Sequence, residues 1–214
     1  MATSYEDAVA QVGAAGQPFE VVEVEVDGGT QRRFAQAPAT MRQIFDGARG
    51  VESTFLVYED EEWSFARVMD EADALGATLV ERYGVAVGDR VGIAMRNLPE
   101  WVVAFAAILS IGAVSVSLNA WWVEDEIAYA VRDSGLSVLI ADDERARRAQ
   151  RPCSESGVPI VVARAGDDLA GVDRWEDVVA AGAAMPDVAL TPDLDATILY
   201  TSGTTGFPKG AVST

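Results

Sequence analysis

The sequence predicts an α/β fold, in which a mostly parallel sheet is flanked by helices. The first observation is that short apolar runs typical of strands alternate with segments of helical periodicity along most of the chain. The second is size, because 214 residues, of which 50% are hydrophobic and 23% charged, can bury a substantial core. Ligands of such sheets bind beyond the carboxyl ends of the strands.

The first third of the chain is expected to contain a hairpin and two helices. Residues 1–18, with a weak helical pattern over 4–15, are interpreted as a peripheral N-terminal segment. The elements expected next are strands 19–26 and 30–34 around the turn signal Asp27-Gly28, a helix over 41–49 capped by Thr40, a strand over 54–58, an acidic turn over 59–62, and a helix that Ser64 caps.

The helix after Ser64 has a long apolar stripe. Its members recur at helical spacing, which indicates one face packed against a core rather than a cofactor site. They are Phe65, Val68, Met69, Ala72, Leu75, Gly76, Leu79, Val80 and Tyr83.

The next helix, over 98–111, is apolar on nearly all sides and should be buried. Asn97 before Pro99, with Glu100 three residues after Asn97, predicts a start of the capping-box type. The flanking elements are strands 90–95 and 113–118, with Gly112 ending the helix.

The rest of the chain continues the alternation. The expected elements are a helix over 124–133, a strand over 136–141, a charged helix over 144–150, a strand over 159–163, a short helix from an Asp173 cap through Val179, a Pro-containing linker over 185–193, and a buried strand over 196–199.

Composition excludes several classes of function. The formal net charge of −18 opposes binding to nucleic acid and to anionic lipid. The chain has no histidine, which removes Ser-His-Asp and Cys-His catalysis and histidine metal sites. Cys153 is the single cysteine, interpreted as an isolated loop thiol, so no internal disulfide forms and a reducing, cytoplasmic location is expected. The first 17 residues lack the pattern of a secretory signal.

One segment also allows a membrane interpretation. Residues 101–123 contain no charged side chain and are long enough to cross a bilayer. Polar residues and glycine interrupt the second half, where alternation appears instead. The favoured interpretation is therefore a buried helix followed by a buried strand, with no membrane span.

The stretch Tyr200-Thr201-Ser202-Gly203-Thr204-Thr205-Gly206-Phe207-Pro208-Lys209-Gly210 is the strongest candidate for a binding site. Glycines let a backbone approach an anion closely, while N–H groups and hydroxyls donate to it. Lys209, the only lysine in the chain, adds a charge suited to phosphate. A Gly- and Thr-rich stretch can also be a plain turn, which is the alternative from composition alone.

The spacing of this stretch differs from the Walker loop and from the dinucleotide fingerprint. It instead resembles, almost residue for residue, the signature loop of the adenylate-forming (AMP-binding) superfamily of acyl-CoA synthetases, luciferases and peptide-synthetase adenylation domains. The segments 88–97 and 112–114 resemble that family's N-terminal core motifs, and 118–122 followed by 124–141 resembles bacterial medium- or long-chain fatty-acid CoA ligases. The resemblance covers residues 19–214, which would be a partial AMP-binding (adenylation) domain.

The resemblance implies a two-step activity that uses ATP, Mg²⁺ and coenzyme A. A carboxylate attacks the α-phosphate of ATP to give an acyl-adenylate and pyrophosphate, and coenzyme A then displaces AMP. It further implies that the hydroxyls or backbone N–H groups of Thr201, Ser202, Thr204 and Thr205 hold the β- and γ-phosphates, that Gly203 and Gly206 allow close approach, and that Lys209 supports the charge.

Nothing in residues 1–214 matches the family's later motifs, so no catalytic residue, Mg²⁺ ligand or coenzyme A contact is assignable within them. We therefore expect a fragment of a fatty-acid CoA ligase without independent catalysis. The alternatives are a non-catalytic nucleotide-binding or association fragment, which would associate through a truncated sheet, and a piece of an amino-acid or aryl-acid activating branch.

Overall fold

The computed structural model describes residues 4–26, 29–179, 183–201 and 208–214. Within it, contacts divide the chain into two units, Met1–Ala39 and Thr40–Thr214.

The first unit contains one helix and one hairpin. Helix α1 (Tyr5–Val12) begins after Ser4, whose hydroxyl accepts a hydrogen bond from the backbone N–H of Asp7 at 3.1 Å. Strands β1 (Val21–Val26) and β2 (Gly29–Phe34) pair antiparallel, with Val21 opposite Phe34. The predicted hairpin is confirmed, while the turn signal Asp27-Gly28 lies outside the described residues.

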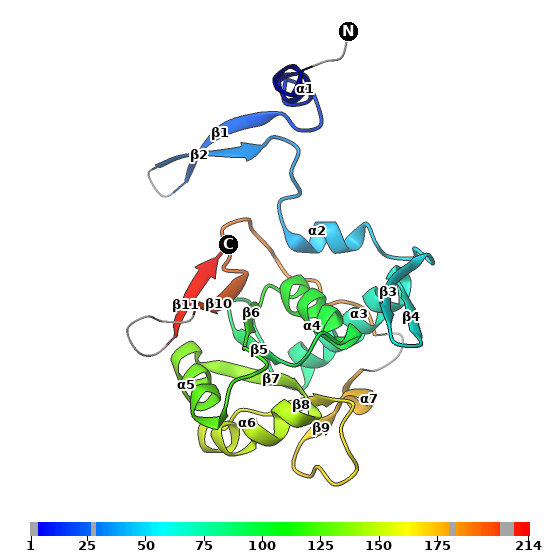
Figure 1. Cartoon of the computed structure of the whole chain (residues 1–214), viewed down its shortest axis with the longest axis vertical. Coiled ribbons are helices and arrows are strands. Elements are labelled where there is room, and N and C mark those ends of the chain that lie inside the picture. The colour runs from blue at the N-terminus through cyan, green and yellow to red at the C-terminus, as the bar shows by residue number, and fades with distance from the viewer. Residues whose placement is uncertain (1–3, 27–28, 180–182, 202–207) are drawn as a thin grey trace. The chain divides into compact units, whose positions relative to one another are not determined.

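The second unit is built on a sheet of seven strands (Figure 1). The order across the sheet is β11-β10-β6-β5-β7-β8-β9, and only the β10–β11 pair is antiparallel. The predicted mostly parallel sheet is therefore confirmed. The strands are β5 (Arg90–Ala94), β6 (Val114–Ser117), β7 (Leu136–Asp142), β8 (Ile160–Ala163), β9 (Asp173–Arg174), β10 (Thr197–Thr201) and β11 (Lys209–Ser213).

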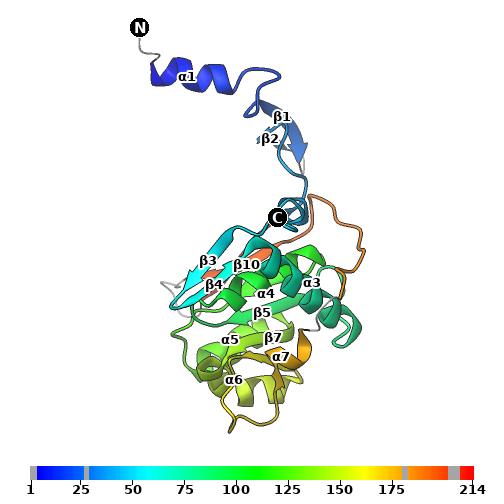
Figure 2. The same cartoon turned by 90° about the vertical axis from the view of Figure 1, so that its right-hand side faces the viewer.

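Helices cover both faces of this sheet (Figure 2). One core joins β5, β7 and β8 to α3 (Phe65–Glu81), α4 (Pro99–Ser110) and α7 (Trp175–Val178). The second core, on the other face, joins the sheet to α5 (Glu124–Ser134) and α6 (Asp143–Ser156). From Val138 to Ala141, consecutive residues of β7 alternate between the two cores, which is why this part of the strand is apolar on both faces. Helix α2 (Met41–Asp46) and the hairpin of β3 (Thr54–Tyr58) and β4 (Glu61–Ser64) pack beside α3 and α4.

Two predicted helices have the expected burial. In α3 the hydroxyl of Ser64 accepts a hydrogen bond from the N–H of Arg67 at 3.1 Å, and Val68, Leu75 and Leu79 of the stripe are fully buried. Helix α4 is buried on most sides and ends before Gly112. Gly112 has φ 71°, and a Cβ there would lie 2.7 Å from Leu190, so glycine suits both the conformation and the space.

Three capping predictions are wrong. Glu100 does not close a capping box, because α4 begins after Leu98 and the Glu100 carboxylate accepts a hydrogen bond from Arg164 Nε at 2.8 Å. Thr40 precedes α2, but its side chain makes no capping hydrogen bond. Asp173 lies in β9, where its carboxylate binds the side chains of Arg82 and Tyr83 instead of capping α7.

Three other expectations change with the tertiary structure. The acidic stretch 59–62 is a turn only in its first half, since β4 begins at Glu61. Helix α6 runs from an Asp142 cap through Pro152 to Ser156, so Cys153 is a fully buried helix residue and not a loop thiol. Strand β10 is only partly buried, with Leu199 53% exposed.

The apolar segment 101–123 divides between α4, a turn at Gly112 and β6, as the favoured interpretation expected. Within the part of the chain that the structure describes, none of the helices has the length and apolar character that a membrane crossing requires.

Candidate functional site

The candidate phosphate loop lies where the topology of the sheet predicts a ligand site. Strand β10 is parallel to β6, with Thr197 opposite Ser115 and Leu199 opposite Ser117. The loop therefore leaves β10 at the carboxyl edge, beside the connections that follow β6 and β5. This edge is where open parallel sheets bind their ligands.

Of the predicted site residues, the structure places the first and the last. Thr201 ends β10, Lys209 begins β11, and the two form a cross-strand pair in which the Thr201 hydroxyl donates to the Lys209 carbonyl at 3.4 Å. Ser202, Gly203, Thr204, Thr205 and Gly206 lie outside the described residues. Because Thr201 and Lys209 lie opposite each other, the two ends of the loop are adjacent.

Lys209 suits an anionic ligand. Its side chain is exposed, and it forms no ion pair with any residue that the structure describes. The Thr201 side chain is also exposed, and Thr201 lies opposite Lys209 in the β10–β11 pair. An ammonium without an acidic partner among the described residues, and a hydroxyl on the opposite strand, suit a phosphate group, so the placed residues are compatible with the triphosphate of ATP.

Tyr200 anchors the start of the loop, a role that the sequence analysis missed. Its hydroxyl donates to Asp133 of α5 at 2.8 Å, and its ring lies edge-on against Trp122 with centroids 5.5 Å apart. The pKa of Tyr200 is raised above its ordinary value of 10.0, mainly by burial and secondly by the hydrogen bond to Asp133. The phenol therefore stays protonated at neutral pH and keeps donating to Asp133. No sequence signal linked these residues, because Asp133 precedes Tyr200 by 67 positions.

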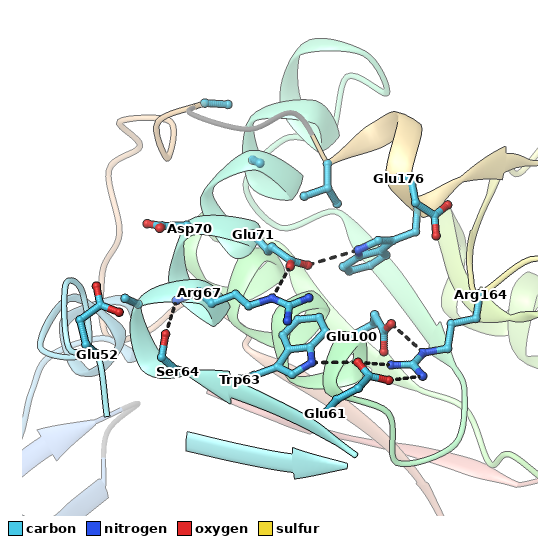
Figure 3. Close-up of a pocket in the computed structure, with 15 residues that line it drawn as sticks. Glu52, Glu61, Trp63, Ser64, Arg67, Asp70, Glu71, Glu100, Arg164 and Glu176 are labelled. Carbon is cyan, nitrogen blue, oxygen red and sulfur yellow. Dashed lines mark hydrogen bonds and ion pairs between the residues drawn. The ribbon is translucent and has the colours of Figure 1, made fainter. Parts of the chain in front are cut away.

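A second cleft, of about 910 Å³, lies at the same edge of the sheet but beside β8 (Figure 3). Arg164 follows β8 and spans two acidic side chains, donating to Glu100 at 2.8 Å and to Glu61 at 2.8 Å and 3.2 Å. Burial alone would lower the pKa of Arg164, but the hydrogen bonds that it donates to Glu100 and Glu61 outweigh burial and raise that pKa. Those bonds keep the pKa of the Glu61 carboxyl below its ordinary range.

The charge of Arg67, the other arginine of this cleft, is also balanced by a carboxylate that lines the cleft. Arg67 binds Glu71 at 3.1 Å, and its guanidinium lies 3.5 Å from the centroid of the Trp63 ring. The cleft is also lined by six carboxylates, namely Glu52, Glu61, Asp70, Glu71, Glu100 and Glu176. This many carboxylates would repel a triphosphate, so the cleft beside β8 is unsuited to one.

Comparisons with known proteins identify the family. The model of the family described as AMP-binding enzyme matches residues 46–214. A medium/long-chain-fatty-acid–CoA/3-oxocholest-4-en-26-oate–CoA ligase from Mycobacterium marinum is 30% identical over 167 residues, which is 73% of this chain and 30% of that protein. A 4-coumarate–CoA ligase 3 from Oryza sativa subsp. japonica is 29% identical over 154 residues, which is 72% of this chain and 27% of that protein.

A solved structure shows the same fold. The anthranilate CoA ligase AuaEII in complex with anthranoyl-AMP superposes with a TM-score of 0.72 at 26% identity, over 83% of this chain and 35% of that one.

The fold and the family match thus define part of an AMP-binding domain. The chain belongs to the AMP-binding family, and its relatives are CoA ligases for several classes of acid. It spans about 30% of the length of the curated relatives that it matches.

Proposed function

We propose that this chain carries the phosphate-binding part of an ATP-dependent fatty-acid CoA ligase. The observation that carries the proposal is the signature stretch 200–210, whose placed ends lie at the carboxyl edge of β10 with an exposed, unpaired Lys209 among the described side chains. In the proposed reaction a carboxylate attacks the α-phosphate of ATP, pyrophosphate leaves, and the thiol of coenzyme A then displaces AMP from the acyl-adenylate.

The loop would bind the two phosphates that leave as pyrophosphate in the first step. Thr201, Ser202, Thr204 and Thr205 would donate to the β- and γ-phosphates, Gly203 and Gly206 would admit them, and Lys209 would offset their charge together with Mg²⁺. The described residues contain no cluster of three metal-binding side chains, so we assign no protein ligand to Mg²⁺. A reducing compartment such as the cytoplasm suits the single cysteine.

A fatty acid is the substrate class that we propose. The support is the resemblance of residues 118–122 to fatty-acid CoA ligases and the 30% identity to the Mycobacterium marinum protein. The aromatic-acid ligases among the relatives give the second candidate class. A panel of fatty, hydroxycinnamic and aminobenzoic acids distinguishes them, by which acid most increases affinity for MgATP.

The test of the proposal is direct binding of MgATP and of pyrophosphate to the chain, by calorimetry or NMR. Lys209→Ala should weaken both by about 10-fold or more, the effect of losing one charge-assisted contact to phosphate. Lys209→Arg, which keeps the charge, should retain most of the affinity. Arg32→Ala is the matched control, because it removes one exposed cation from β2 in the other unit.

Absence of MgATP and pyrophosphate binding to the unmodified chain would refute the proposed function. Equal weakening by Arg32→Ala and Lys209→Ala would instead show that only net charge matters.

We also propose that the outer edge of β11 lets chains associate. All five residues of β11 are exposed, and Leu199 and Val212 expose 53% and 55% of their surfaces. No described strand pairs with that edge, which leaves backbone donors and acceptors open to another strand.

A further inference from the structure

The connection between β6 and α5 (residues 118–123) is held by two arginines of α6. Arg145 Nε donates to the carbonyl of Ala120 at 2.8 Å, and Arg148 Nη1 donates to the carbonyl of Trp122 at 3.3 Å. The connection also folds on itself, since the Trp122 N–H donates to the carbonyl of Asn119 at 3.0 Å. Both ends of its central turn are thus fixed from a helix that follows a different strand.

Arg145 itself has a fixed position. It is 3% exposed, and its Nη1 binds Asp142 at 3.2 Å and Glu144 at 2.9 Å. Asp142 in turn accepts from the backbone N–H of Arg96 at 2.9 Å. One buried ion pair therefore joins the chain segments that follow β5, β6 and β7.

The connection carries Trp122, whose ring contacts Tyr200 at the start of the candidate loop. Trp122 is 8% exposed, and its ring meets Tyr200 edge-on at 69°, while Tyr129 of α5 contacts the same tyrosine with centroids 6.5 Å apart. Tyr200 stands immediately before Thr201, at the point where β10 ends. A shift of Trp122 would therefore move the start of the loop.

We propose that Arg145 and Arg148 are positioning residues for phosphate binding, acting through Trp122 and Tyr200. We assign them no direct contact with phosphate. Their hydrogen bonds to the 118–123 connection hold Trp122 against Tyr200, and this contact sets the end of β10 from which residues 201–209 extend. The inference rests on the proposed function for its ligand, but the arrangement of β10 can be measured without one.

The substitutions are chosen in matched pairs. Trp122→Phe keeps an aromatic edge-to-face partner for Tyr200, whereas Trp122→Leu removes it. Arg148→Ala removes the donor to the Trp122 carbonyl. Arg147→Ala, one residue earlier on the same helix, removes an arginine that binds Asp143 and Asp168 and has no hydrogen bond to the connection.

The two measurements are pyrophosphate and MgATP affinity, and amide hydrogen exchange of residues 197–201 in the ligand-free chain. Trp122→Leu should weaken the affinity for pyrophosphate and MgATP about three- to tenfold, which is the effect expected from losing one aromatic pair. Trp122→Phe should stay within about twofold. Arg148→Ala should speed exchange in β10 and weaken affinity, while Arg147→Ala should do neither. Urea unfolding of each variant corrects for changes in global stability.

Unchanged exchange in β10 for both Trp122→Leu and Arg148→Ala would overturn the inference. So would equal effects of Arg147→Ala and Arg148→Ala at matched stability. If the unmodified chain binds neither ligand, the proposed function fails, and the exchange measurement alone still decides whether Arg148 and Trp122 position β10.

Discussion

Arg164 shows how one residue organises a part of the surface that no sequence pattern indicated. It follows β8 with φ 55°, a conformation that non-glycine residues rarely adopt. From there its guanidinium reaches Glu61 of the β3–β4 hairpin and Glu100 of α4, which is 6% exposed. A carboxylate buried to that extent needs a cation, and this need explains why Glu100 does not cap its own helix.

Cys153 gives a prediction at the scale of one side chain. The thiol is fully buried in α6, and burial raises its pKa to about 12. Because the thiolate is the reactive form, a disulfide reagent at about pH 8 should label the folded chain at least 100-fold more slowly than the chain in urea. The kinetics of labelling with and without urea measure this ratio.

The raised pKa of Cys153 also makes the stability of the fold depend on pH. The folded chain holds the thiol proton more tightly than the unfolded chain, so this contribution is complete below the ordinary pKa of 9.0 and is lost as the pH rises above it. Rapid, complete labelling of the folded chain near pH 8 would contradict the buried position.

At the scale of elements, the residues that begin the helices show which capping interactions depend on sequence neighbours and which depend on tertiary contacts. Ser64 and Asp142 accept from backbone N–H groups three residues ahead, an arrangement that depends only on neighbours in sequence. Asp173 is equally suited to capping, yet it binds Arg82 and Tyr83 of the segment after α3. A partner distant in sequence therefore overrides a local capping preference.

Ser64 and Thr40 make a matched test of this distinction. Both precede helices, but only the Ser64 hydroxyl accepts a capping hydrogen bond, from Arg67 N at 3.1 Å. Ser64→Ala should lower the free energy of unfolding by about 1 kcal/mol, and Thr40→Ala should change it by less than about 0.5 kcal/mol. Urea denaturation followed by circular dichroism measures both, and equal losses would show that capping at Ser64 contributes nothing special.

For the whole molecule, charge opposes the association that the free edge of β11 favours. The chain has 34 acidic and 16 basic side chains, so pairing every cation would still leave 18 carboxylates to repel a second copy. Repulsion between exposed charges is screened over about 10 Å at 0.1 M salt, whereas strand pairing and apolar contact at Leu199 and Val212 are not.

We therefore expect self-association to increase with ionic strength. Sedimentation velocity at about 0.02 M and about 0.3 M NaCl should show a larger associated fraction at the higher salt. Val212→Glu, which places a charge on the exposed strand and adds to the negative charge of the chain, should reduce that fraction. A chain that stays monomeric at both salt concentrations would exclude the β11 edge as an association surface.

The sequence by itself determined the alternation of strands and helices, the long apolar faces of α3 and α4, and the family motif at 200–210. These depend on periodicity and on contiguous residues, which sequence reports directly. It could not determine the contacts around the motif, because Trp122 and Asp133 meet Tyr200, and Arg145 meets Ala120, only after the strands take their order in the sheet. The tertiary structure alone decided those contacts, as it did the pairing of Glu100 with Arg164 and the burial of Cys153. The physical reason is that buried charge and aromatic packing select partners by proximity in space, while helical and strand patterns select neighbours along the chain.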